Sequence, residues 1–271
     1  MLAQKMIFWQ RWNPDYLITI LRVALGFIFV IGGIKIAFPP DPEALAASYI
    51  DPSKGWISPF FGENITGNLG ISISSFLKIQ GLIEIFLGIV LILGIFTSIV
   101  AIVMGLMFWS FTVANPIVGE VRLSRDIALM GLCFALALIG DGALSIDRRF
   151  LGIQSKFFER RDPFLLIIRM SLAYTLIDSA LFSGGVFDNH LNTSLPVVVV
   201  LLMGFLIAVG IFPRRVMVLI FVWMLYLILM NLIVKGIFPG LDSVKREIGF
   251  LAASFVYFML GPDRWAWPKP R

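Results

Sequence analysis

Cysteine, histidine and charge are all scarce in this sequence. Its 271 residues include one cysteine, Cys133, and one histidine, His190. One cysteine excludes a disulfide within the chain and a cysteine-ligated cluster, and one histidine excludes a bis-histidine haem. Charged residues are 14% of the total, against about 25% in soluble domains. We therefore expect no haem or metal, so any redox cofactor would come from the lipid phase or from a partner.

Apolar residues dominate what is present. They make up 59% of the chain, and the mean hydropathy is +0.92, far above soluble domains. Eight windows hold about 20 mostly apolar residues, the length that crosses a bilayer core as a helix. The apolar runs are continuous, whereas the strands of a membrane barrel would alternate. The sequence thus predicts an all-α integral membrane protein with eight transmembrane helices, at 17–38, 71–93, 96–115, 123–140, 164–186, 194–211, 216–234 and 244–261.

The eight windows form two similar sets of four. Leu-Gly-Ile-Phe at 93–96 returns 116 positions later as Val-Gly-Ile-Phe at 209–212, and Arg-Asp-Ile at 125–127 returns after 121 positions as Arg-Glu-Ile. A period this long is not that of a solenoid and indicates a duplicated membrane module. Four helices per unit is an even number, which predicts two parallel repeats. We expect a first repeat at 1–140, a cytoplasmic linker at 141–163 and a degenerate second repeat at 164–271.

Positive charge predicts the orientation. Twelve Lys and Arg residues lie in the loops and tails on one side of the predicted helices and three on the other. The positive-inside rule then places both termini in the cytoplasm, as a multi-pass protein of the cytoplasmic membrane. The first apolar run lacks a cleavage signal, so we expect its helix to remain. Because topology accounts for the net charge of +5, nothing calls for nucleic acid.

The outer side carries one long connection, the loop at 39–70. Its aromatic residues and sparse charge predict a cap on the outer membrane face, with a short helix at 43–49. The alternative is a passive surface loop.

Ionisable residues inside the apolar windows are the best functional pointers, since each costs a few kcal/mol to insert. Glu84 falls near the predicted bilayer midplane and shares a helix face with Gln80, Gly81 and Gly88. The glycines would let another helix approach, so Glu84 is predicted to face protein. A carboxyl group taken out of water can exchange protons near neutral pH. The alternative is a structural carboxylate held by Gln80 or Lys35.

A second set of charges is expected near the outer ends of the first-repeat helices. Lys35, Lys78, Arg122 and Arg125 would form a positive cluster able to bind an oxyanion if their helices are neighbours. The alternative is that the lysines reach to lipid headgroups. Asp126 beside Arg125 is a candidate acid, or a residue stabilised at a helix start. The second repeat has fewer such groups, so we expect the first to hold any active site.

The order of several motifs resembles one membrane family. Arg22-x-x-x-Gly26, Gly32-Gly33-x-Lys35, Gly81-x-x-Glu84-x-x-x-Gly88, Arg125-Asp126-Ile127 and a Gly-Asp-Gly-Ala-Leu-Ser-Ile-Asp-Arg run at 140–148 are similar to those of the DoxX/DoxD-type four-helix membrane proteins. The family includes a subunit of thiosulfate:quinone oxidoreductase. The resemblance covers about residues 22–148, and the second repeat only weakly.

The resemblance implies a membrane subunit of a quinone-linked oxidoreductase, with thiosulfate as candidate electron donor. Glu84 and Asp126 would then be catalytic, while Lys35, Lys78, Gln80, Arg122 and Arg125 would bind substrate. Phe86 and Trp109 are expected beside the quinone. Other membrane or periplasmic redox subunits are expected partners, besides lipid. Two alternatives remain: a non-catalytic anchor of a larger redox or photosynthetic complex, and a small-solute transporter.

Overall fold

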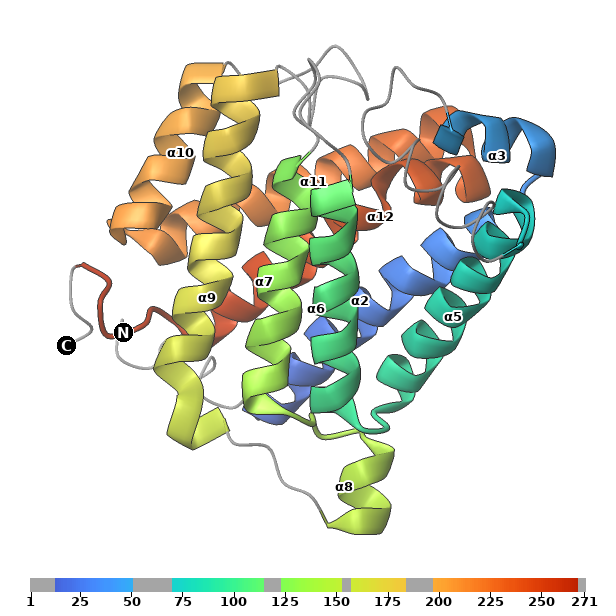
Figure 1. The fold of residues 1–271 in the computed structure, drawn as a ribbon. Coiled ribbons are helices and arrows are strands. Elements are labelled where there is room, and N and C mark those ends of the chain that lie inside the picture. Colours follow the sequence, from blue (N-terminus) through green and yellow to red (C-terminus); the bar gives the residue numbers. More distant parts are fainter. Residues whose placement is uncertain (1–12, 51–69, 115–122, 153–156, 184–196, 268–271) are drawn as a thin grey trace.

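A computed structural model describes residues 13–50, 70–114, 123–152, 157–183 and 197–267. Within these ranges the fold is all-α, with ten α-helices, one short π-helical segment and no sheet (Figure 1). Four helical stretches are long and apolar enough to cross a membrane, and the prediction of apolar membrane helices is confirmed to that extent. They are Pro14–Ala37 (α2), Ile73–Leu93 (α5), Glu159–Leu181 and Pro213–Lys235 (α11).

The remaining helices follow the predicted windows with shifted ends. Two are apolar but shorter, within α6 (Thr97–Ala114) and α10 (Val197–Val209). α7 spans Leu123–Ile139, and α9 spans Phe157–Asp178 with a kink at Arg160 and a π-helical continuation, Ser179–Ser183. α12 spans Ile237–Leu260 and begins seven residues before its window, so it includes a charged first half. The short helices are α3 (Pro42–Ile50), which confirms the helix expected at 43–49, and α8 (Ile146–Leu151).

Glycine seams bring α2 and α5 together as an antiparallel pair. A Cβ on Gly33 would lie 2.5 Å from the carbonyl oxygen of Gly81, and a Cβ on Gly26 would lie 2.7 Å from that of Gly88. Only glycine permits two backbones to approach this closely. The predicted face of α5 is confirmed, because Gly81, Glu84 and Gly88 are all buried against the protein. Glu84 therefore lies between two close backbone contacts, which fix its position along the interface of α2 and α5.

Helices from opposite halves of the chain pack on one another. α12 packs along α2, and α7 packs along α9. Gly131 of α7 admits the Ser171 side chain of α9, and Ala24 of α2 and Ala252 of α12 are both buried on the other side. In Figure 1 α6, α7 and α9 stand side by side while α2 and α5 run obliquely beside them. We call the end of the molecule near α3 the α3 end, and the opposite end the α8 end.

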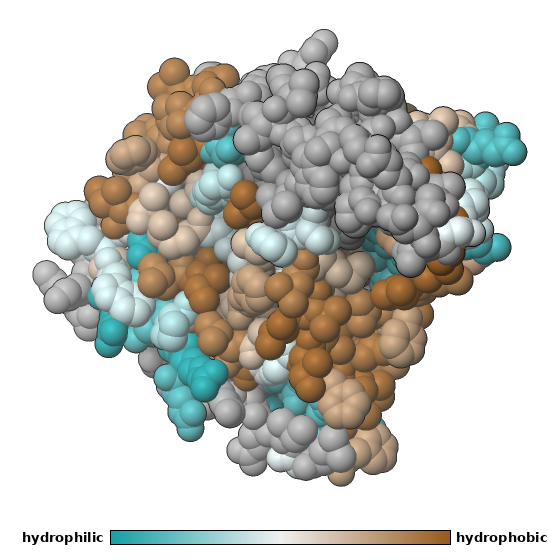
Figure 2. Space-filling view, in the orientation of Figure 1, coloured by the Kyte–Doolittle hydropathy of each residue, from teal (hydrophilic) through white to brown (hydrophobic). Residues whose placement is uncertain are grey.

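The outer surface of the helices is largely hydrophobic. Figure 2 shows hydrophobic side chains over α10 and over α5 and α6, with hydrophilic ones near α3 and at the foot of α9. Exposed residues of α5 and α6 include Leu82, Ile89, Ile99 and Leu106. Apolar surface of this extent on several helices suits contact with lipid.

The sequence echo at 93–96 and 209–212 is also an echo of backbone geometry. Gly94 and Gly210 end α5 and α10 with φ of 72° and 82°, and Phe96 and Phe212 follow with φ of 48° and 46°. A phenylalanine with positive φ is uncommon, so its occurrence at both positions shows that the two turns are built alike. A buried arginine caps each turn. Arg22 donates to the carbonyl oxygens of Ile92 and Leu144, and Arg169 to those of Ile207 and Ala208.

Candidate functional site

Glu84 lies at the centre of the α2–α5 contact. It is 4% exposed, and its Oε1 accepts a hydrogen bond from the Gln80 amide at 3.0 Å. Its other oxygen, Oε2, faces Gly32 of α2, where an added Cβ would lie 3.4 Å away. The same point is 4.0 Å from Nζ of Lys245, which belongs to α12. Glu84 is thus held by its own helix on one side and faces a lysine of the second half on the other.

Lys245 belongs to a chain of charges that reaches the α3 end. Its Nζ is 2.8 Å from Oδ1 of Asp242, and the other oxygen of Asp242 is 2.7 Å from Nζ of Lys35. Asp242 therefore joins the last turn of α2 to α12. Lys35 was expected either in a cluster of positive charges or beside Glu84, and the structure gives it a carboxylate partner from α12 instead.

The Arg-acid pairs of the two halves exchange partners. Arg125 of α7 is 3.4 Å from Oε1 of Glu247 on α12, and Arg246 of α12 is 3.1 Å from Oδ1 of Asp126 on α7. Asp126 and Glu247 are buried, with side chains 7% and 1% exposed. Buried carboxylates need such partners, because an unpaired one would be strongly destabilising. These two pairs explain why the motif occurs in both halves.

Eight charged residues from four helices therefore gather at the α3 end, and we call them the charge cluster. They come from both halves and balance in sign. The acids are Glu84, Asp126, Asp242 and Glu247, and the bases are Lys35, Arg125, Lys245 and Arg246.

Sequence reasoning did not identify Asp242 and Lys245 as members of the charge cluster. Asp242 precedes the apolar window at 244–261 and Lys245 lies at its edge, so neither stands inside an apolar window, where an ionisable residue is conspicuous. The signal that could have identified them is the repeated Arg-acid motif. If this motif joins α7 to α12, then the charges beside it on α12 lie at the same contact.

Other residues predicted for the site lie elsewhere. Lys78 is exposed and, with Ser74, lines a hollow of about 380 Å³ between α3 and the ends of α2 and α5. Arg122 lies outside the described residues. Phe86 and Trp109 are 65% and 54% exposed, on the outer faces of α5 and α6. Both rings face the surroundings, away from the buried carboxylate.

An apolar groove of about 420 Å³ runs between α2, α11 and α12. It is lined by residues such as Val23, Phe27, Phe221 and Phe255. These positions of α2 precede Gly32 by one turn or more, so the groove lies along the half of α2 toward the α8 end. Its lining suits hydrocarbon and is separate from the charge cluster.

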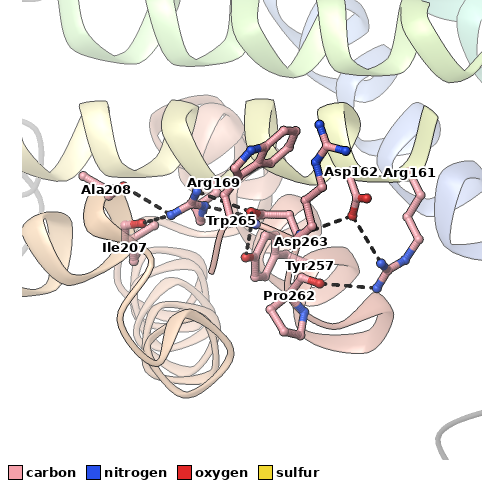
Figure 3. Close-up of polar contacts among 10 residues, drawn as sticks. Arg161, Asp162, Arg169, Ile207, Ala208, Tyr257, Pro262, Asp263 and Trp265 are labelled. Carbon is pink, nitrogen blue, oxygen red and sulfur yellow. Dashed lines mark hydrogen bonds and ion pairs between the residues drawn. The ribbon is translucent and has the colours of Figure 1, made fainter. Parts of the chain in front are cut away.

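A second polar cluster lies at the α8 end and is structural in character (Figure 3). Asp263 pairs with Nε of Arg169 at 2.9 Å and accepts hydrogen bonds from the Tyr257 hydroxyl and the Trp265 amide, both at 3.0 Å. Arg161 donates to the carbonyl oxygens of Leu260 and Pro262 beside it. The arginines of α9 thus fasten the end of α12 and the segment after it, and Arg169 also reaches α10 through Ile207 and Ala208. Tyr257 and the Trp265 amide hold Asp263 in place. We therefore assign this cluster to fold stability.

The cluster at the α3 end differs because one of its buried carboxylates, Glu84, has a neutral amide as its hydrogen-bond donor and a lysine across a glycine. Such an arrangement can hold, give and accept a proton.

Comparison with protein-family models, with curated proteins and with solved structures finds no match to this chain.

Proposed function

We propose that the chain crosses the cytoplasmic membrane eight times, as two four-helix repeats of the same orientation with both termini in the cytoplasm. The matched turns at Gly94 and Gly210, with their arginine caps, support two repeats at 1–140 and 164–271. The exchanged ion pairs support a repeat interface through α7 and α12. In this topology the α3 end faces outward and the arginine-rich α8 end faces the cytoplasm.

We further propose that the protein is a membrane subunit of a quinone-linked oxidoreductase, in which the charge cluster handles protons. The observation that carries this proposal is Glu84, a carboxylate buried eleven positions into an apolar helix and faced by Lys245. An ionisable group at that depth is costly and, by default, functional. The motif resemblance to the DoxX/DoxD family supplies the quinone and thiosulfate chemistry.

The residues fit a quinone in one respect. Gln80 offers an amide N–H and a protonated Glu84 an O–H, and a quinone carbonyl can accept from both. Phe86 presents its ring to the lipid side of the same helix, away from Glu84. When bound, a quinone would accept two electrons and two protons. Glu84 would hold a proton for transfer, Gln80 would orient its carboxyl group, and the packed α2–α5 seam would keep water from the cytoplasmic side away.

A non-catalytic anchor is the second candidate, and a specific observation favours it. The charge cluster is balanced in sign, and three of its four ion pairs link one half to the other, as a purely structural clamp would do. The hollow beside Lys78 and the apolar groove between α2, α11 and α12 are both lined by residues other than Glu84. An anchor would need Glu84 only for packing.

The test compares native membranes from a deletion strain that is complemented with wild-type chain or with Glu84→Gln. Glutamine keeps the size and the hydrogen bond from Gln80 but removes the exchangeable proton. We expect quinone to co-purify with both, and thiosulfate-dependent quinone reduction to fall by roughly 10²–10⁴-fold in the variant, the usual contribution of a positioned acid or base.

The matched control is Glu43→Gln, which removes an exposed carboxylate on α3. It should reduce quinone at the wild-type rate. Equal rates in wild type and Glu84→Gln would contradict the catalytic role. Wild-type membranes with neither bound quinone nor thiosulfate-dependent reduction would contradict the oxidoreductase proposal and favour the anchor.

A further inference from the structure

We propose that Lys245 and Asp242 of the second half form a proton relay that connects Glu84 with the water at the α3 end, with Lys35 as a positioning residue. The relay rests on the proposed proton transfer by Glu84 and names its route. It also gives α12 a chemical role, since both relay residues come from that helix.

The first support is a gradient of exposure along the ionised groups. The side chains of Lys35, Asp242 and Lys245 are 57%, 30% and 20% exposed, while Glu84 is 4% exposed. Consecutive members are joined by ion pairs of 2.7 and 2.8 Å, and the last step crosses Gly32. The exposure falls from the water-facing Lys35 to the buried Glu84, and an added Cβ on Gly32 would lie 3.4 Å from Oε2 of Glu84 and 4.0 Å from Nζ of Lys245. No ion pair joins these two groups, so the proposed last transfer crosses the space beside Gly32.

The second support is that the opposite direction is closed. From Glu84 toward the α8 end, every residue of α5 at 85–93 is apolar or glycine. The same is true of α2 at 23–31, down to Arg22, which is fully buried and donates to backbone carbonyls. Protons have no ionisable carrier along this seam, so among the described residues of α2 and α5 the path leads to the α3 end.

The steps balance in protons and charge. Glu84 is a carboxylate once it has released its proton, which a quinone would accept when bound. The Lys245 ammonium then passes a proton to that carboxylate and becomes a neutral amine. Asp242, protonated from water, returns a proton to the amine and is again a carboxylate. One proton leaves the outer water for each one delivered. A quinone would need two such deliveries for each reduction, with thiosulfate as its two-electron donor.

Lys35 holds Asp242 in place and takes no part in the proton transfer. Its Nζ binds Oδ2 of Asp242, which leaves Oδ1 facing Lys245. The other charges near Glu84 at the α3 end are Lys78 on its own helix, Glu43 on α3 and the two pairs between α7 and α12, Arg125–Glu247 and Arg246–Asp126. None of these is part of the proposed relay.

The test measures how fast Glu84 follows the pH of each side. Wild-type protein is reconstituted in one orientation in vesicles, established by protease access to the linker at 141–163. The infrared band of the Glu84 carboxyl group, identified by its loss in Glu84→Gln, is then followed after a pH jump on one side only. We expect the band to respond to the side of the α3 end and not to the other.

Lys245→Arg separates a relay from a structural ion pair. Arginine can keep the contact with Asp242 but stays protonated at all pH values that proteins experience. We therefore expect a folded protein whose Glu84 responds at least about tenfold more slowly, a modest part of the effect of a positioned proton carrier. Asp242→Asn should slow the response similarly, and Glu43→Gln, at an exposed position of α3, should leave it unchanged.

Two results would overturn the relay. One is a wild-type response rate in both Lys245→Arg and Asp242→Asn, and the other is a Glu84 band that follows the α8 side. The readout does not depend on turnover. A working relay in a protein that fails to reduce quinone would therefore contradict the proposed oxidoreductase function alone.

Discussion

Single glycines determine where Glu84 can be buried. Gly33 and Gly81 face each other across α2 and α5. A Cβ on Gly33 would lie 2.5 Å from the carbonyl oxygen of Gly81, and a Cβ on Gly81 would lie 2.7 Å from that of Gly33. Gly32, one position earlier, faces the Glu84 carboxylate at ordinary contact distance. Neighbouring glycines therefore have different tasks, because Gly33 permits the helix contact and Gly32 leaves room for the carboxylate.

Gly33→Ala should destabilise the protein, while Gly32→Ala should not. The new methyl group at position 33 would meet the Gly81 carbonyl at 2.5 Å and force the helices apart, at a cost of about 1–3 kcal/mol. At position 32 the methyl group has 3.4 Å to its nearest neighbour and suits the helix better than glycine. Unfolding in mixed micelles by denaturing detergent measures both. An equal loss of stability in the two variants would contradict the proposed glycine seam.

Elements of the two halves are joined by a reciprocal exchange. α7 offers Arg125 and Asp126, α12 offers Arg246 and Glu247, and each arginine pairs with the acid of the other helix. A single arrangement repeated in both halves thus produces two equivalent contacts at their interface. Sequence reasoning predicted a substrate-binding Arg125 and an acidic or helix-start role for Asp126, and it did not predict the exchange, since the paired residues lie about 120 positions apart.

Removing one partner of the Arg125–Glu247 pair should cost more than removing both. Arg125→Met leaves Glu247 buried without this cation, which we expect to cost about 3 kcal/mol or more. Arg125→Met with Glu247→Met should restore most of the loss, because neither charge is then buried. A double-mutant cycle on the free energy of unfolding measures the coupling, expected at roughly 1–3 kcal/mol.

The Lys35–Asp242 pair provides the comparison for this cycle. Lys35 is more than half exposed, so its coupling to Asp242 should be only about 0–1 kcal/mol. Additive losses for Arg125 and Glu247 would mean that the two helices are held by packing alone.

At the scale of the whole molecule, the sequence predicts the helices and their buried faces better than the contacts between residues far apart in the chain. Continuous apolar runs predict the helices, and the stripe of Gly81, Glu84 and Gly88 predicts the buried face of α5, because both patterns are local. The charge cluster is not local. Asp242 and Lys35 are 207 positions apart in the chain, and no local sequence pattern around either residue indicates the contact. The start of α12 at Ile237 was missed because its first half is charged.

The account depends on Glu84 being a working acid in the membrane rather than a packed carboxylate. The most direct measurement is the infrared difference spectrum of the reconstituted protein between oxidised and electrochemically reduced quinone. We expect a carboxyl band that changes on reduction, persists in Glu43→Gln and vanishes in Glu84→Gln. A spectrum without a carboxyl change, or one that keeps the same band in Glu84→Gln, would contradict the account.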